Sequence, residues 1–163
     1  MFVFMLTFNS KGLLVPNLNI QSSISELKNE FVDNIPTDKR KILFNNFIEY
    51  SRQLKVACNN VEVLQWIDGS FTTKIPYPDD IDLVTFIDYS VIEPNEALLN
   101  NYKFPQSVDI FVVDAYIVKV YPDNHLKYPL FIGDRSYWMD RFDRTRRNRA
   151  GNRLPKGFLE IKN

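Results

Sequence analysis

The most restrictive feature of the sequence is the run Ile81–Ile87, which is apolar on both of its alternating faces once its leading acidic residues are set aside. A strand that is apolar on both faces is covered on both sides, as in the interior of a layered protein. We therefore expect this segment to form a strand buried inside a β-sheet. The rest of the chain must supply the strands and helices that surround it.

Two segments before this strand carry helix signals. Ser23 and Glu26 have the spacing of a capping box, and apolar residues then repeat at helical spacing to about Asp33. Thr37 is suited to cap a second helix, because its hydroxyl can accept a hydrogen bond from a free backbone N–H of the first turn. The apolar face of that helix is expected to end near Ala57.

Three other segments carry weaker signals. Residues 61–68 alternate between apolar and polar side chains, which predicts a strand that ends just before Gly69. Residues 94–102 predict a short helix. Residues 108–120 form a long β-branched and aromatic run that is interrupted by two aspartates. Such a run predicts one long strand or two short ones.

The expected elements follow the order helix, helix, strand, loop, strand, helix, strand and a mixed tail, after an apolar opening strand over residues 1–8. No repeat, low-complexity tract or linker divides the 163 residues, a length that suits one domain. We therefore predict a single α/β (α+β) domain over residues 1–163. It should contain a small mixed β-sheet with helices packed on it.

The composition indicates the environment of the protein. Hydrophobic residues make up 45% of the chain and charged residues 25%, as in an ordinary globular protein. The one cysteine, Cys58, cannot form an internal disulfide, which favours a reducing, cytoplasmic compartment. No apolar stretch is long enough to cross a bilayer, so we expect no membrane partner.

The formal net charge is zero, but the charges are unevenly distributed. The segment Arg141–Lys156 has seven basic residues and one acidic residue, whereas the remainder of the chain has 13 basic and 19 acidic residues. A basic segment beside an acidic body indicates a site for an anion, such as a triphosphate or a nucleic-acid phosphate, or for an acidic partner. A solvated basic loop explains the same pattern equally well.

The residues that carry chemistry lie between the expected strands. Gly69 and Ser70 end one strand, and Asp80 and Asp82 open the next about ten residues later. Side chains alternate along a strand, so the two carboxylates project from one face and repel each other unless a cation lies between them. A hard divalent cation such as Mg²⁺, or Mn²⁺ in its place, prefers oxygen ligands of this kind.

The residues around the glycine suit a phosphate group. Gly69 lets a phosphate approach the backbone without a Cβ in the way, and Ser70 adds a hydroxyl donor. Lys74 is close enough in sequence to add positive charge. Each of these features alone is common, because Gly-Ser and Pro-Asp-Asp often do no more than mark turns. Their combination at this spacing indicates a site for a metal ion and a phosphate.

This combination resembles the signature of the nucleotidyltransferase (polymerase-beta-like) superfamily, in which an apolar-Gly-Gly/Ser segment and a loop precede Asp-x-Asp/Glu within a strand. The chain is also similar to a family of small bacterial nucleotidyltransferase-like proteins, and this resemblance spans nearly the whole chain. The matching segments are Phe8–Gly12, Asp68–Phe71, Pro78–Asp82 and, after a Trp…Phe…Arg segment, Pro155–Phe158.

The resemblance implies a nucleotidyltransferase fold and transfer of a nucleoside monophosphate from a nucleoside triphosphate to a hydroxyl group, with release of pyrophosphate. The acceptor would be a protein, a tRNA or a small molecule. Asp80 and Asp82 would be catalytic and would bind Mg²⁺ or Mn²⁺. Gly69 and Ser70 would bind the β- and γ-phosphates of the nucleotide, with Lys74 nearby.

A third carboxylate usually completes such a site and helps to activate the attacking hydroxyl. Asp109 and Asp114 are both candidates. They are five residues apart, so on one regular strand they point to opposite faces and only one of them can join the site. We favour Asp114 as the third catalytic and metal-binding residue, because a good strand continues after it.

The superfamily includes antitoxins that modify a partner toxin, so the resemblance implies a toxin–antitoxin or defence setting with a toxin as protein partner. An alternative hypothesis is a non-catalytic module that binds a nucleotide or a partner on the same fold. A third is a plain structural protein in which the aspartates are incidental. Metal-dependent nucleotide binding separates the first two hypotheses from the third.

Overall fold

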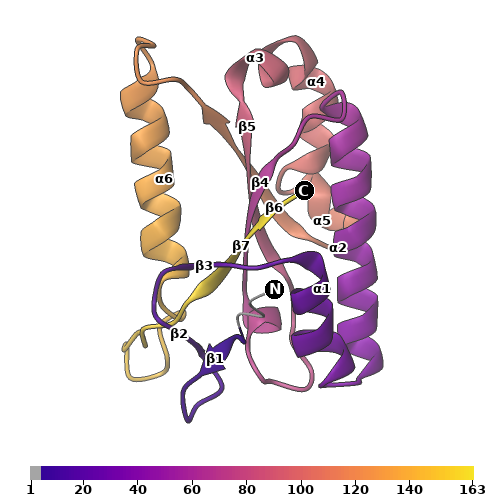
Figure 1. Ribbon diagram of the computed structural model, residues 1–163, viewed down its shortest axis with the longest axis vertical. Coiled ribbons are helices and arrows are strands. Elements are labelled where there is room, and N and C mark those ends of the chain that lie inside the picture. Colours follow the sequence, from indigo (N-terminus) through magenta and orange to yellow (C-terminus); the bar gives the residue numbers. More distant parts are fainter. Residues whose placement is uncertain (1–4) are drawn as a thin grey trace.

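The computed structural model describes residues 5–163 (Figure 1). Its strands are β1 (Thr7–Phe8), β2 (Leu14–Val15), β3 (Asn19–Gln21), β4 (Leu64–Asp68), β5 (Asp82–Asp88), β6 (Asp114–Val120) and β7 (Phe158–Lys162). Its α-helices are α1 (Ile24–Lys28), α2 (Asp38–Ala57), α3 (Tyr89–Ile92), α4 (Glu96–Leu99), α5 (Gln106–Phe111) and α6 (Tyr128–Phe142). Other helical turns are η1 (Asn29–Asp33), η2 (Ser70–Thr72), η3 (Glu93–Asn95) and η4 (Asn100–Tyr102).

Five strands form one mixed sheet in the order β3-β7-β4-β5-β6. Strand β4 is antiparallel to both of its neighbours, whereas β3 is parallel to β7 and β5 is parallel to β6. Strands β1 and β2 form a separate antiparallel pair. The predicted α+β class with a small mixed sheet is confirmed, and so is the interior position of β5.

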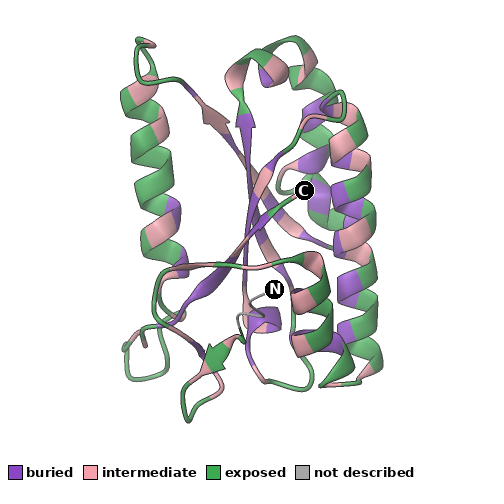
Figure 2. Ribbon diagram, viewed as in Figure 1, coloured by how far each residue is buried: buried purple, intermediate pink, exposed green. Residues whose placement is uncertain are grey.

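Helices cover the sheet unequally on its two faces. Helices α1, α2, α4 and α5 lie on one side, and α6 lies alone on the other (Figure 1). The larger core is built by α2 and the sheet, and a smaller aromatic cluster around Trp66, Phe158 and Trp138 joins α6 to the opposite face. Most of α6 is exposed, and its buried residues lie near its C-terminal end (Figure 2).

The two helices predicted from their caps are present. The Ser23 hydroxyl accepts from the Glu26 backbone and the Glu26 carboxylate accepts from the Ser23 backbone, which completes the capping box of α1. Thr37 caps α2 by accepting from the backbone N–H of Arg40 at 3.3 Å. The face of α2 that carries Phe47 is fully buried against the sheet, which is the main source of stability for a helix of this kind.

Other expectations need correction. Residues 108–111 of the run predicted as one long strand or two short ones belong to helix α5, and only Asp114–Val120 is a strand. The tail contains helix α6, which the sequence pattern did not indicate. Of the opening strand expected over residues 1–8, Thr7–Phe8 is observed as β1, and residues 1–4 lie outside the described residues.

The helical prediction for residues 94–102 is confirmed as the consecutive short turns η3, α4 and η4. Among the helices of residues 5–163, none combines the length and the apolar character that crossing a bilayer requires.

Candidate active site at the edge of the sheet

Three neighbouring strands bring aspartates to one edge of the sheet. Asp82 is the first residue of β5, and it lies in register with Asp68, the last residue of β4. On its other side Asp82 lies in register with Asp114, the first residue of β6. Because β5 runs antiparallel to β4 and parallel to β6, the end of β4 meets the starts of β5 and β6.

Three of the carboxylates are close enough to share a metal ion. Asp80, Asp82 and Asp114 each offer a carboxylate oxygen, and these oxygens lie within 4.8 Å of one another. Asp82 Oδ1 and Asp114 Oδ1 are buried and have no hydrogen-bond partner among the described residues. Buried polar atoms are normally satisfied, so a cation bound between these oxygens would supply the missing partner. Asp109, the other candidate for the third carboxylate, is exposed on α5 and outside this cluster.

The crowding of negative charge affects Asp82 most. The pKa of Asp82 is raised to about 7, mainly by burial and also by the charges of Asp80, Asp68 and Asp114, while Arg146 acts against them. A bound divalent cation would favour the ionised carboxylate and lower this pKa. The electrostatics therefore fit a cation site.

Gly69 and Ser70 lie directly against the carboxylates. Gly69 has a φ of 84°, and a Cβ built on it would lie 3.1 Å from the backbone nitrogen and 3.2 Å from Oδ2 of Asp82. A side chain at this position would press on the cluster, which explains the glycine in physical terms. The Ser70 hydroxyl accepts from the backbone N–H of Asp79 at 3.0 Å and so orders the loop that leads to Asp80.

Lys74 does not reach the site. Its ammonium group pairs with Glu30 and lies 4.2 Å from the ring centroid of Phe8. It is absent from the residues that line the cavity described below. The nucleotide-binding role expected for Lys74 from its position in the sequence is therefore not supported by its position in the structure.

A different lysine lies at the site. Lys156 is buried and forms an ion pair with the equally buried carboxylate of Asp68. Burial raises the pKa of Asp68, and the charge of Lys156 lowers it. Backbone contacts fix this lysine in place, because its N–H donates to the carbonyl of Asp143 at 2.9 Å and that of Gly157 donates to Leu14 at 2.7 Å. In the sequence Lys156 lies in the basic segment expected to bind an anion and in the Pro-Lys-Gly ending, but neither signal indicates its pairing with Asp68.

A cavity of about 650 Å³ opens over this edge of the sheet. Its volume is in the usual range for small-molecule sites. Part of its lining comes from the strand ends and the loop between β4 and β5, and includes Asp68, Gly69, Ser70, Asp79, Asp80 and Asp82. Another part comes from the end of α6 and the loop after it, namely Tyr137, Asp140, Arg141, Phe142, Arg144, Thr145, Arg146, Arg147, Arg153 and Lys156.

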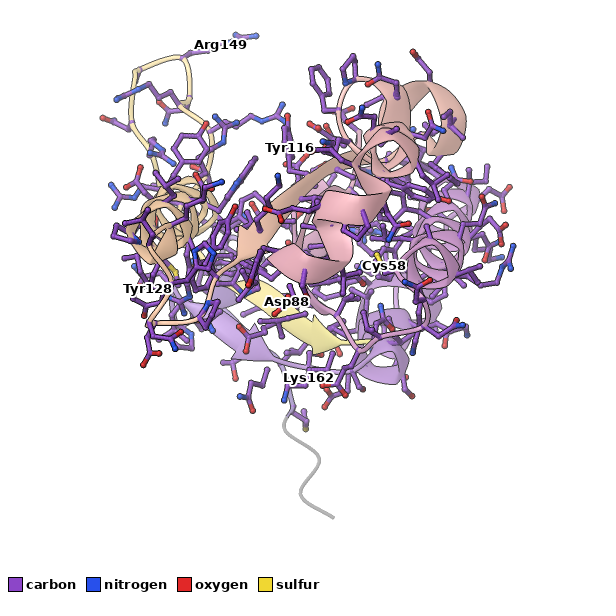
Figure 3. All side chains as sticks on the ribbon, turned by 90° about the horizontal axis from the view of Figure 1, so that it is seen from above. Cys58, Asp88, Tyr116, Tyr128, Arg149 and Lys162 are labelled. Carbon is purple, nitrogen blue, oxygen red and sulfur yellow. The ribbon has the colours of Figure 1, made fainter. Side chains whose placement is uncertain are left out.

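The basic segment is thus divided between the cavity and the solvent. Five of its arginines line the cavity, namely Arg141, Arg144, Arg146, Arg147 and Arg153. Arg149 is exposed at the tip of the loop, away from the body of the protein (Figure 3). The interpretation as a solvated loop applies to the tip, and the interpretation as an anion site stays a prediction for the arginines that line the cavity.

This arrangement has a definite chemical capacity. The aspartate cluster suits a divalent cation, and the arginines of the cavity suit the anionic oxygens of a phosphate or carboxylate ligand. A metal-bound polyphosphate would suit both groups, because its metal ion can bind the aspartates while its phosphates bind the arginines.

No curated protein and no solved structure matches the chain significantly. One family model does, and it matches residues 6–162, which include every residue of the aspartate cluster and of the basic loop. The chain therefore belongs to DUF6932, a family of unknown function.

Proposed function

We propose that the protein is a metal-dependent nucleotidyltransferase with a nucleotidyltransferase (polymerase-beta-like) fold. It would transfer a nucleoside monophosphate from a nucleoside triphosphate to a hydroxyl group. The observation that carries this proposal is the cluster of Asp80, Asp82 and Asp114, of which Asp80 and Asp82 line a cavity together with five arginines.

The proposed cofactor is Mg²⁺, with Mn²⁺ as its substitute, held by the three clustered aspartates. The buried oxygens of Asp82 and Asp114 that have no partner among the described residues support this assignment. All the ligands are carboxylate oxygens, which hard divalent cations prefer over sulfur or nitrogen ligands. When bound, the cation would offset the negative charge that develops on the transferring phosphate and the leaving group.

The protein groups have separate tasks in this reaction. The segment Gly69–Ser70 would hold the β- and γ-phosphates beside the carboxylates. The attacking hydroxyl oxygen would form a bond to the α-phosphorus while the bond from that phosphorus to the bridging oxygen breaks, and pyrophosphate would leave. Asp114, at the start of β6, would accept the proton of the hydroxyl group. Positioning and charge neutralisation would supply most of the rate enhancement.

The acceptor would be a protein, a tRNA or a small molecule, and a partner toxin would fit a toxin–antitoxin setting in the cytoplasm. A non-catalytic nucleotide-binding module is the alternative, and it differs from the enzyme in binding nucleotide without transferring any part of it.

The proposal is tested by label transfer from nucleoside triphosphates labelled at the α-phosphate, with Mg²⁺ and with total cellular RNA and protein as acceptors. Wild type should transfer label, and Asp82→Asn should reduce transfer by about 100-fold or more, because it removes a ligand for the charge-neutralising cation. Asp109→Asn is the matched control, since Asp109 is an exposed aspartate outside the cluster. Equal transfer by wild type and Asp82→Asn would contradict the proposal, and binding without transfer would favour the alternative.

A further inference from the structure

One arginine of the loop after α6 contacts the aspartate cluster directly. Arg146 Nη2 lies 3.5 Å from Asp80 Oδ2 and 3.8 Å from Asp82 Oδ2. Strong charge-assisted hydrogen bonds between a guanidinium and a carboxylate are shorter, at about 2.7–2.9 Å. The side chain of Arg146 is 77% exposed, so solvent weakens the contact further. This is a loose ion pair that a stronger ligand can replace.

The loop does not depend on this contact for its structure. Arg144 pairs with Asp143 at 2.8 Å and with Asp140 at 3.2 Å. Backbone hydrogen bonds close the loop, from Thr145 to Leu154 at 2.8 Å and from Asn148 to Asn152 at 2.9 Å. Arg146 thus extends from an ordered support, and its side chain can change partner while the backbone of the loop stays in place.

Arg146 and a metal ion would compete for the same two carboxylates. The guanidinium faces Oδ2 of Asp80 and Oδ2 of Asp82, and both carboxylates belong to the group of three that can hold a cation. A divalent cation bound by these carboxylates would repel the guanidinium. Displaced from the carboxylates, Arg146 would still line the cavity, where a phosphate presents the anionic oxygens that guanidinium groups bind.

We propose that Arg146 exchanges partners during substrate binding: it pairs with Asp80 and Asp82 before the cation arrives, and then binds a phosphate group of the nucleotide. This inference rests on the metal site of the proposed function and adds a residue to its binding of phosphate. Arg146 would therefore weaken the binding of a free metal ion and strengthen the binding of a nucleotide that carries a metal ion.

The test measures binding of Mn²⁺ alone, and then binding of ATP at saturating Mn²⁺, by titration calorimetry on the full chain. Arg146→Gln should bind Mn²⁺ about two- to five-fold more tightly than wild type, because the competing charge is removed. It should bind ATP about 10-fold more weakly, because a charge-assisted contact to phosphate is lost. Arg149→Gln is the matched control, an exposed arginine of the same loop outside the cavity, and it should change neither affinity.

A second variant separates the effect of the positive charge of Arg146 from the effect of its hydrogen-bonding geometry. Arg146→Lys keeps the positive charge, so it should restore the wild-type affinity for Mn²⁺, and it should recover only part of the ATP affinity because an ammonium group cannot form two parallel hydrogen bonds. Equal Mn²⁺ affinity in wild type and Arg146→Gln would overturn the inference and leave the metal site intact. Absence of Mn²⁺ binding in every variant would overturn the proposed function together with it.

Discussion

At the scale of single residues, Asp82 and Asp68 are the two carboxylates of the site whose pKa burial raises, and the rise is larger for Asp82. Asp82 lies between Asp68 and Asp114 in the sheet and beside Asp80, and its pKa is raised from 3.8 to about 7. In the unfolded chain the pKa would be near the ordinary value of about 3.9. The folded protein therefore holds a proton on Asp82 more tightly than the unfolded chain does. This difference stabilises the fold below pH 4 and is lost as the pH rises to about 7.

The resulting prediction concerns the metal-free protein. Its free energy of unfolding should fall by on the order of 3 kcal/mol between pH 4 and pH 8 through Asp82. Asp82→Asn should remove most of this fall, so the variant should be more stable than wild type at pH 8 and similar to it at pH 4. Urea denaturation at a series of pH values measures both differences. A variant that is less stable than wild type at pH 8 would mean that ionised Asp82 supports the fold.

Sequence reasoning found some of these residues and missed others for clear reasons. The closeness of Asp80 and Asp82 is predictable, because residues two apart on a strand project from the same face and this needs only the local sequence. The Gly-Ser pair before them adds the prediction of a phosphate site. Lys156 could not be found in this way, because its partner Asp68 is 88 residues away in the chain. Lys74 shows that closeness in sequence does not fix where a side chain points: it follows Gly69 by five residues, but its ammonium group pairs with Glu30.

At the scale of elements, α2 supports the site through one buried arginine. Arg40 is fully buried and donates hydrogen bonds to the backbone carbonyls of Phe31, Phe71, Thr73 and Ile75. Three of these carbonyls belong to the loop that follows Ser70. Burial lowers the pKa of Arg40 to about 10, so the guanidinium stays protonated at neutral pH. Helix α2 thereby holds the loop between β4 and β5 in position.

Replacing this arginine should affect both stability and the site. Arg40→Lys keeps a charge but cannot reach several carbonyls at once, which should cost about 2–4 kcal/mol of stability by leaving buried carbonyls without donors. It should also weaken Mn²⁺ binding, because the loop leading to Asp80 loses its support. Urea denaturation and calorimetry measure the two effects. Lys39→Ala, an exposed neighbour on α2, should change stability by less than about 0.5 kcal/mol, and an equal loss in both variants would contradict this role.

Helices and strands are predictable where neighbouring residues in the sequence carry capping or spacing signals. Helices α1 and α2 follow from their capping residues and apolar spacing. For the segment of helix α5 the sequence predicts a strand, because Val108, Ile110 and Phe111 are residue types that are common in strands. Tertiary packing overrides that preference, since Phe111 is buried in the core and Val112 ends the helix with a φ of 57°. Helix α6 gave a weak signal because only Trp138 and Phe142 are buried along its length.

At the scale of the whole molecule, the basic segment of the sequence lies in contact with the acidic residues at the ends of strands β4 and β5. The basic segment at 141–156 turns back onto the acidic edge of the sheet. Lys156 meets Asp68, and Arg146 meets Asp80 and Asp82. Without a ligand, the anionic groups that the basic segment contacts are therefore carboxylates of the protein itself. A metal-bound nucleotide would fit between these carboxylates and the basic segment, because it brings a cation for one and phosphates for the other.

The measurement that tests this account most directly is a thermal-shift series with ATP, GTP, CTP and UTP, each with and without Mg²⁺. It compares wild type with the double variant Asp80→Asn, Asp82→Asn. A nucleotide at 100 times its dissociation constant should stabilise wild type by about 2.7 kcal/mol, which is about 5–10 °C in Tm for a domain of this size. We predict that this shift requires Mg²⁺ and disappears in the variant. No shift with any nucleotide, or an equal shift in the variant, would contradict a metal-dependent nucleotide site at these aspartates.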